Sequence, residues 1–292
     1  MKNISLNLRG KLEPQVLQLL RGAARVAAEQ RVPFFVVGAS ARDMLLEHGF
    51  GVRSTRATTD IDLAIAIGDW AAYGRFFSAL TQSDVLKPVT GIAHRYELVR
   101  SSLTVDIVPF GEIEKPVGVI AWPPRFETTM TVTGFRDALA CAWTAELDAD
   151  LAVRVASLHG LAFLKILAWR ERNRETQRDG VDLDFIIRQY GSPVMQERLK
   201  GESLHVWERE DFDTLAAGAR LLGNDMAGAM SENTKALVCE TLEHESRDES
   251  GLRLVQIMAG RGADDDMIDR AIAQLRRVRE GIDEAWNSSG AG

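Results

Sequence analysis

The chain has 292 residues, of which 46% are hydrophobic, and a formal net charge of −7 at pH 7. This length and composition suit a soluble globular protein of about two domains. The acidic balance excludes a protein that coats nucleic acid nonspecifically, although a local basic groove stays compatible with it.

The two cysteines, Cys141 and Cys239, are too few and too far apart for a disulfide framework or a zinc knuckle, which fits a reducing cytosol. The N-terminus lacks the apolar segment of a signal peptide. No apolar run reaches the ~18 residues of a membrane span, and the best candidate, GLAFLKILAW, contains Lys165. We therefore expect a cytoplasmic protein with no membrane partner.

The first part of the chain alternates helical patterns with short apolar runs. Ser40 and Asp69 are predicted N-caps of the second and third helices. The predicted elements are a helix over 13–30, a buried strand over 32–38, a helix over 40–49, a strand over 60–67 and a helix over 69–82.

Further strands follow. Residues 91–100 and 103–110 are predicted to form a hairpin around Ser101 and Ser102, and Pro109 indicates that its second strand ends there or lies at an edge. The remaining elements of this half are a strand within 129–135, a short helix over 136–146 and a last strand over 150–157.

After residue 157 every predicted element is a helix. The helical segments are 157–175, 181–190, 211–230, 232–244, 251–260 and 265–286. The sequence thus predicts an α/β half (an α+β domain with a mixed sheet) followed by a mostly α-helical half. We place the boundary within 135–157 and define the domains as 1–145 and 146–292.

The chemistry is concentrated in three short stretches, VVGAS, DID and VDIVPF. Gly38 ends a strand and opens a helix, where backbone amides favour an anion and Ser40 can donate a hydroxyl. Asp60 and Asp62 are two apart on one strand, so both carboxylates face the same side. Asp106 lies in the second strand of the hairpin, from which it could join them.

Three converging carboxylates are hard oxygen ligands of the kind that Mg²⁺ prefers. Two such ions stabilise the attacking and leaving oxygens in nucleotidyl transfer, and Mn²⁺ is an alternative to Mg²⁺. A lone Asp-x-Asp or a lone strand Asp is more often a solvated surface feature. The order of all three after a Gly-Ser turn is what favours a metal site.

That order resembles the polymerase-β-like nucleotidyltransferase superfamily, and more specifically the AbiEii/AbiGii-type nucleotidyltransferases, including MenT-like toxins. The stretches that carry the resemblance are VVGASARDMLL, RATTDIDLAIAI, VDIVPFGEI, LAFLKILAWRER and RDGVDLDFII. They span residues 36–187, about half of the chain. The resemblance implies a catalytic nucleotidyltransferase domain and a helical domain that contributes to the active-site cleft.

The resemblance also implies residue roles. Asp60, Asp62 and Asp106 would be catalytic and ligate metal, and Lys165 and Asp182 would be catalytic residues of the last motifs. The residues that would bind the nucleoside triphosphate are Gly38, Ser40, Arg42, Arg56, Lys165 and Arg178. The chain departs from the family at the turn, where its sequence is GAS. It also has Arg178 where members often have lysine, a difference that keeps the charge but not the geometry.

Lys165 has two possible roles. An unpaired ammonium within an apolar helix is costly, so Lys165 either reaches the triphosphate or pairs with Asp182 as a structural strut. The nearby Arg170, Arg172, Arg174 and Arg178 either steer a triphosphate or an RNA end, or form a solvated helix end together with neighbouring glutamates.

The predicted reaction is transfer of a nucleoside monophosphate from a nucleoside triphosphate to an acceptor, with Asp106 as a candidate general base. The resemblance points to a toxin of a toxin–antitoxin system that modifies tRNA or protein and has a cognate antitoxin. One alternative is a small-molecule nucleotidyltransferase of the aminoglycoside type, which suits the acidic chain. A CCA-adding enzyme ranks lower because no neck motif follows, and a non-catalytic nucleotide-binding regulatory protein has no evident need for three carboxylates.

Overall fold

The chain folds into two compact units, an α/β unit that ends at Ser157 and a helical unit that begins at Leu158. The structure is a computed structural model that describes residues 4–53, 60–82, 86–92, 94–99, 101, 103–247 and 252–289. We predicted a domain boundary at 145/146 from the sequence. The observed division lies later because the strand at 152–155 pairs with two other strands of the first unit.

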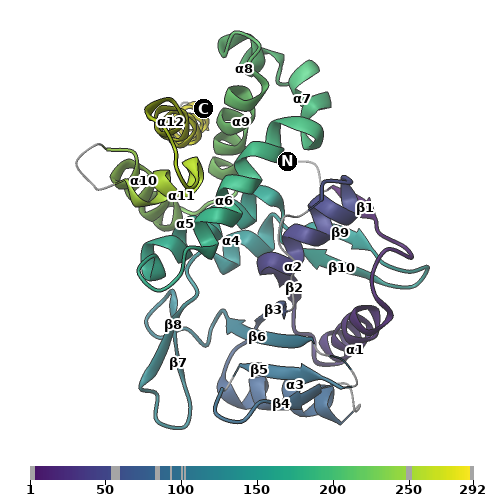
Figure 1. Cartoon of the computed structure of the whole chain (residues 1–292). Helices are drawn as coiled ribbons and strands as arrows, with labels where there is room; N and C mark the ends of the chain where they lie inside the picture. The colour runs from purple at the N-terminus through teal and green to yellow at the C-terminus, as the bar shows by residue number, and fades with distance from the viewer. Residues whose placement is uncertain are drawn as a thin grey trace. The chain divides into compact units, whose positions relative to one another are not determined.

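The α/β unit is built on a mixed sheet of eight strands in the order β1-β9-β10-β2-β3-β6-β5-β4 (Figure 1). Its strands are β1 (Ser5–Asn7), β2 (Phe34–Val37), β3 (Asp60–Ala66), β4 (Leu86–Pro88), β5 (Arg95–Leu98), β6 (Thr104–Phe110), β9 (Trp143–Glu146) and β10 (Ala152–Val155). A separate hairpin pairs β7 (Val119–Trp122) with β8 (Thr128–Thr131). The sheet confirms the predicted mixed α/β class.

Strand β6 is buried except at Thr104, and β3 is buried from Leu63 to Ile65, as is typical of central strands covered on both faces. They run parallel, whereas β2 pairs antiparallel with β3, and β5 pairs antiparallel with β6. Pro109 lies inside β6, next to β3 but beyond the stretch that pairs with β5, so its missing N–H removes no bond to β5.

Two helices of this unit begin where the sequence indicates. The first, α1 (Pro14–Gln30), starts with proline, and the side chain of Asp69 accepts the hydrogen bond of Ala72 N at 2.7 Å to cap α3 (Trp70–Thr81). These two helices pack against each other (Figure 1). The others are α2 (Gly38–Asp43), the π-helical η1 (Met44–Gly49) and α4 (Phe135–Ala140).

The helical unit contains α5 (Leu158–Arg172), α6 (Arg178–Gln189), η2 (Tyr190–Val194), α7 (Gln196–Lys200), α8 (Leu204–Arg209), α9 (Thr214–Ala227), α10 (Glu232–Glu245), α11 (Arg253–Ala259) and α12 (Asp265–Ser289). Helices α9 and α12 approach closely at Gly223, where an added Cβ would lie 2.1 Å from the Val278 carbonyl oxygen. None of the helices in the described residues is long and apolar enough to cross a membrane.

Three predictions at the level of elements are wrong. Strand β6 neither ends at Pro109 nor lies at an edge of the sheet, since it runs to Phe110 between β3 and β5. Ser40 is not an N-cap, because α2 begins directly at Gly38 and Val37 occupies the cap position. The helix predicted over 136–146 ends at Ala140, and the stretch WTAE forms β9, whose apolar residues alternate with polar ones in the strand pattern.

Candidate active site

The predicted carboxylates lie on two neighbouring central strands. Asp62 of β3 is directly opposite Asp106 of β6, and Asp60 is two residues earlier on the same face of β3. The same row of the sheet continues to Val37 of β2 on one side and to Arg95 of β5 on the other. The register therefore brings the three predicted carboxylates to one face of the sheet.

The turn at Gly38 fits against this row. Gly38 has φ +68°, and a Cβ added there would lie 2.0 Å from Oδ2 of Asp62, so only glycine leaves room for that carboxylate. Ser40 Oγ donates to the Val37 carbonyl oxygen at 3.0 Å and accepts from the Asp62 backbone N–H at 3.3 Å. Ser40 thus ties the turn to the strand that carries the carboxylates.

Asp106 has a partner that the sequence interpretation missed. Arg95 donates two hydrogen bonds to it, Nε to Oδ1 at 2.8 Å and Nη2 to Oδ2 at 2.7 Å. These bonds to Asp106 raise the pKa of Arg95, and the charges of Asp60 and Asp62 add to the effect.

The predicted hairpin contains Arg95, but the strand register expected from its turn does not pair Arg95 with Asp106. A turn centred on Ser101 and Ser102 would place Asp106 opposite Glu97, a pair of like charges. The observed register is shifted, so that Arg95 faces Asp106.

The chemistry of these residues fits a divalent cation, since three carboxylates on one face offer hard oxygen ligands. Within the described part of the chain, however, no group of three or more His, Cys, Asp or Glu side chains is close enough together to hold a metal ion. Both oxygens of Asp106 are engaged by Arg95 instead. Asp60, Asp62 and Asp106 could hold a metal ion together if Asp106 were released from that pair.

The two arginines predicted to flank the turn have different outcomes. Arg42 is 3% exposed, and its Nε and Nη2 lie 2.8 and 2.6 Å from Oδ1 of the adjacent Asp43. Its guanidinium therefore forms part of the protein interior and has a partner there. Arg56 lies outside the described residues.

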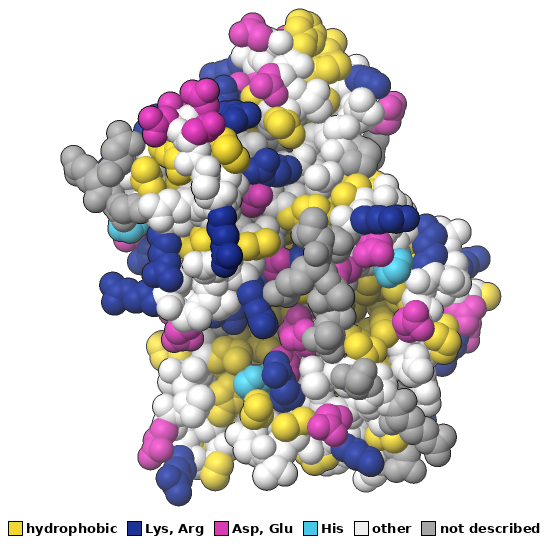
Figure 2. Space-filling view, in the orientation of Figure 1, with side chains coloured by type: hydrophobic (Ala, Val, Ile, Leu, Met, Phe, Trp, Pro, Cys, Tyr) yellow, Lys and Arg dark blue, Asp and Glu magenta, His cyan; other side chains and the backbone are white. Residues whose placement is uncertain are grey.

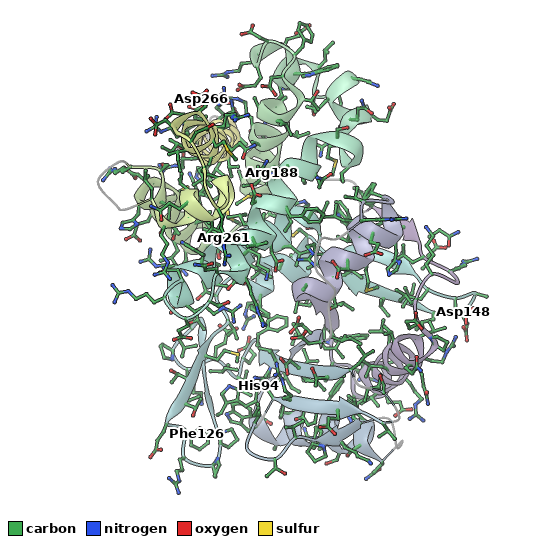
Figure 3. The ribbon with its side chains drawn as sticks, in the orientation of Figure 1. His94, Phe126, Asp148, Arg188, Arg261 and Asp266 are labelled. Atoms are coloured by element: carbon green, nitrogen blue, oxygen red, sulfur yellow. The ribbon has the colours of Figure 1, made fainter. Side chains whose placement is uncertain are left out.

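An aromatic group lies next to Arg95 along the chain. The centroid of the His94 ring lies 5.4 Å from that of Trp122, and the Trp122 centroid lies 5.1 Å from that of Trp70. Burial lowers the pKa of His94, so this imidazole is mainly neutral at pH 7. Figure 3 labels His94 near the sheet and Phe126 at the tip of the β7–β8 hairpin.

His94 also lines a pocket of about 300 Å³. Its other walls are Gly91, Ile92, Trp122, Pro123, Pro124, Arg125, Glu127 and Thr128. The charges of Asp106 and Arg95 act on the His94 imidazole, so His94 is common to the pocket and to the surroundings of Asp106.

In the helical unit, Lys165 of α5 pairs with two aspartates of α6. Its Nζ lies 3.0 Å from Asp179 Oδ1 and 2.7 Å from Asp182 Oδ2, and both aspartates are at most 2% exposed. Arg172 holds Asp179 as well, with Nε 2.7 Å from Oδ2. Burial raises the pKa of Asp179, but Arg172 and Lys165 outweigh it and lower that pKa overall. The structure thus joins Lys165 to Asp182, and Asp179 and Arg172 belong to the same cluster.

The predicted basic cluster lies where α5 ends and α6 begins, and Figure 2 shows Lys and Arg side chains gathered over this region. Arg178 is the exposed first residue of α6. Arg170 pairs with Glu240 of α10 at 2.9 Å. Arg172 is half exposed although it binds Asp179. The cluster therefore combines ion pairing with an exposed basic surface.

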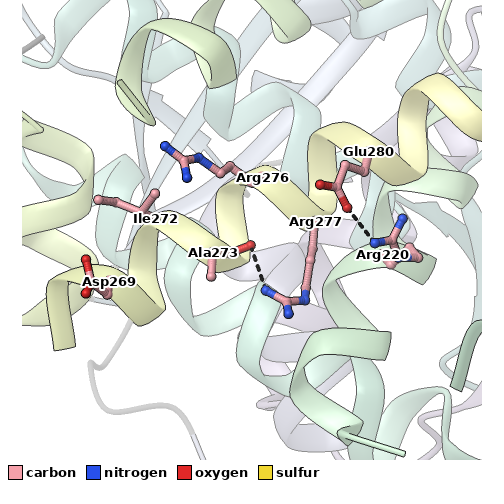
Figure 4. A pocket seen from close by; sticks show the side chains of 7 residues that line it. All are labelled: Arg220, Asp269, Ile272, Ala273, Arg276, Arg277 and Glu280. Atoms are coloured by element: carbon pink, nitrogen blue, oxygen red, sulfur yellow. Dashed lines mark hydrogen bonds and ion pairs between the residues drawn. The ribbon is translucent and has the colours of Figure 1, made fainter. Parts of the chain in front are cut away.

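A larger hollow of about 550 Å³ lies between α9 and α12 (Figure 4). It is lined by Arg220, Asp269, Ile272, Ala273, Arg276, Arg277 and Glu280. The guanidinium of Arg220 is held by Glu210, Glu280 and Glu284, and Arg277 also binds Glu210. These ion pairs engage Arg220 and Arg277, whereas Arg276 donates a hydrogen bond to the Ser246 carbonyl oxygen at 3.2 Å.

Comparison with known proteins gives one broad match. The family described as "Nucleotidyl transferase AbiEii toxin, Type IV TA system" matches residues 19–236. No curated protein matches the chain.

Among solved structures, the antibiotic-resistance factor ANT(2'')-Ia is similar at 15% identity, over 68% of this chain and 99% of that one, with a TM-score of 0.37. A putative nucleotidyltransferase from H. pylori is 14% identical, over 94% of this chain and 98% of that one, with a TM-score of 0.35. A CCA-adding enzyme in complex with ATP is 14% identical over 96% and 72% of the two chains, with a TM-score of 0.27.

These structural similarities are distant, and the family match carries the assignment. It covers most of the α/β unit and more than half of the helical unit, including the carboxylate row and the Lys165 cluster. The chain therefore belongs to the AbiEii family and is a nucleotidyltransferase.

Proposed function

We propose that the chain transfers a nucleoside monophosphate from a nucleoside triphosphate to an acceptor, and that Asp60, Asp62 and Asp106 hold Mg²⁺ or Mn²⁺ for this reaction. The main support is the register that sets Asp62 opposite Asp106 with Asp60 on the same face. Placing like charges together is unfavourable unless a cation joins them, so a two-ion site is a physical reason for this arrangement.

The triphosphate is proposed to bind along the turn at Gly38 and Ser40. That turn contacts Asp62 directly, so phosphates bound there lie next to the carboxylates. Mg²⁺, when bound, neutralises charge on the phosphates. Arg42 is a weaker candidate for phosphate contact, because it is buried on Asp43. Arg178, the exposed first residue of α6, stays a proposed phosphate contact.

In the proposed reaction a hydroxyl of the acceptor attacks the α-phosphorus. A new P–O bond forms to the acceptor, the bond to the β-phosphate oxygen breaks, and pyrophosphate leaves. The hydroxyl proton goes to Asp106, which can accept it once Arg95 no longer holds both of its oxygens.

For the acceptor we propose tRNA or protein, with the chain acting as the toxin of a toxin–antitoxin pair and a cognate antitoxin as its partner. The family description, which names a toxin of a type IV system, supports this role. A small cationic acceptor of the aminoglycoside type is the second candidate, favoured by the net charge of −7. The pocket lined by His94 is a place where either acceptor could bind.

Label transfer tests the proposal. The protein is incubated with each α-³²P-labelled triphosphate and with total RNA, a protein extract or aminoglycosides, and the fraction that takes the label identifies the acceptor. We expect Asp60→Ala and Asp62→Ala to reduce transfer at least 100-fold, because each removes a carboxylate that would hold the metal ion beside the phosphates. This reduction corresponds to about 3 kcal/mol of transition-state stabilisation.

The matched control is Asp150→Ala, which removes an exposed carboxylate of the same unit. It should keep transfer at the wild-type rate. Wild-type transfer by Asp62→Ala, in a protein that is folded by circular dichroism, contradicts the assignment of the carboxylates.

A further inference from the structure

The pair of Arg95 and Asp106 lies in the centre of the proposed site. Residues Val37, Asp62, Asp106 and Arg95 occupy one row across four adjacent strands, so Arg95 lies on the same face as the carboxylates. Arg95 is at the end of this row, and it contacts the carboxylate that also faces Asp62.

The two hydrogen bonds from Arg95 to Asp106 are charge-assisted and bidentate, which makes them strong. Two parallel N–H···O bonds of 2.8 and 2.7 Å join a planar guanidinium to a carboxylate, a geometry that fixes orientation as well as charge. A cation that binds Asp106 would come close to this guanidinium, and the two positive charges repel each other. Arg95 and a metal ion therefore compete for Asp106.

The exposure of the two partners differs. The Arg95 side chain is 34% exposed, whereas the Asp106 side chain is 11% exposed. The partly exposed guanidinium can exchange its bonds to Asp106 for bonds to water or to another anion, while the carboxylate on a central strand stays in place. The pair can therefore open by movement of Arg95 alone.

We propose that Arg95 is a latch on Asp106 that keeps the metal site incomplete until a nucleoside triphosphate binds. This inference rests on the proposed function. The negative phosphates supply a new partner for the released guanidinium, so metal and triphosphate enter together. Arg95 is then a positioning residue that couples the two binding events.

Arg95 binds both oxygens of Asp106, so both are engaged while the pair is closed. The charges of Asp60 and Asp62 also act on Arg95 and strengthen its hold in the absence of a cation.

Direct metal binding tests the latch without measuring activity. The affinity of the full chain for Mn²⁺ is measured by electron paramagnetic resonance of the free ion, with and without a non-hydrolysable triphosphate. We expect Arg95→Gln to bind Mn²⁺ about tenfold or more tightly than the wild type when no triphosphate is present, because it lacks the competing charged bonds. We also expect the enhancement of Mn²⁺ binding by triphosphate to be smaller in Arg95→Gln.

Four further variants complete the design. Arg95→Lys keeps the charge but loses the two-bond geometry, so its affinity should lie between those of the wild type and Arg95→Gln. Arg136→Gln removes an exposed arginine that pairs with Glu112 in the same unit, and should change nothing. The single variant Asp106→Asn and the double variant Arg95→Gln/Asp106→Asn should bind Mn²⁺ with the same affinity, because Arg95 then has no carboxylate at position 106 to compete for.

The outcomes separate this inference from the proposed function. If Asp106→Asn weakens Mn²⁺ binding but Arg95→Gln leaves it unchanged or weakens it, Arg95 is merely structural and the latch is wrong. If neither substitution changes Mn²⁺ binding, the carboxylate metal site itself is wrong, and the latch fails with it.

Discussion

Gly38 is the residue on which the geometry of the carboxylate row depends most directly. Its φ of +68° is disfavoured for residues with a side chain, and the space that a Cβ would need is filled by Oδ2 of Asp62. The sequence pattern predicts a phosphate-binding turn at this glycine. The structure adds a second requirement, which is the close approach of the Asp62 carboxylate.

We expect Gly38→Ala to lower the free energy of unfolding by about 2 kcal/mol or more, from strain and displacement of Asp62, and to abolish transfer. Gly10→Ala is the matched control, because Gly10 has φ +70° and open space around its Cβ position. Urea unfolding and label transfer measure both effects. Equal losses of stability in the two variants, with transfer intact in Gly38→Ala, would show that Asp62 is not displaced.

His159 is a second residue with a measurable consequence. It is 2% exposed in α5, and burial lowers its pKa to about 4, with Arg198 adding to the effect and Asp225 opposing it. The unfolded chain takes up the proton near pH 6.5, and the folded chain only near pH 4. The contribution of His159 to the free energy of unfolding is therefore fully present above pH 6.5. It is lost between pH 6.5 and 4, by at most about 3 kcal/mol.

The check is the urea midpoint of the wild type and of His159→Gln at pH 7.5 and pH 4.5. We expect the variant to lose less stability than the wild type on acidification, whatever its stability at pH 7.5. His205→Gln, an exposed histidine of the same unit, should retain the wild-type pH dependence. An unchanged slope in His159→Gln would mean that this imidazole is not held neutral by the fold.

At the scale of elements, the pair of α5 and α6 is held by the Lys165 cluster. The ammonium lies between two buried carboxylates that are three residues apart on α6, and so on the same face. The periodicity of the sequence finds both helices, and the strut was one of its two interpretations of Lys165. The contact itself depends on how α6 packs against α5, which a single sequence does not reveal.

We expect Lys165→Ala to lower the free energy of unfolding by about 3–5 kcal/mol, because two buried carboxylates then lose the ammonium that lies between them. Arg170→Ala on the same helix removes an exposed pair with Glu240 and should cost less than about 1 kcal/mol. Urea unfolding and triphosphate affinity are measured together. Weakened triphosphate binding at unchanged stability would instead support the phosphate role of Lys165.

For the whole molecule, the sequence predicted an α/β part followed by a helical part, and the structure confirms both classes. The helical periodicities of 157–175 and 265–286 correspond to α5 and α12, because long amphipathic or apolar patterns leave little choice of structure. Short elements were missed, among them β1 and β4, since three residues carry too little pattern to be recognised. These strands form only because partner strands offer them hydrogen bonds.

The sequence by itself determined the family and the class of enzyme, because these depend on residue types in a fixed order, and it predicted which residues bind metal and phosphate. Only the tertiary structure decided which charges face one another. The pairing of Arg95 with Asp106 depends on the register of a hairpin, the fit of Gly38 on Asp62 depends on the approach of a turn to a strand, and the Lys165 cluster depends on helix packing. A shift of one or two residues in any of these would bring different charges together, and local sequence does not set that shift.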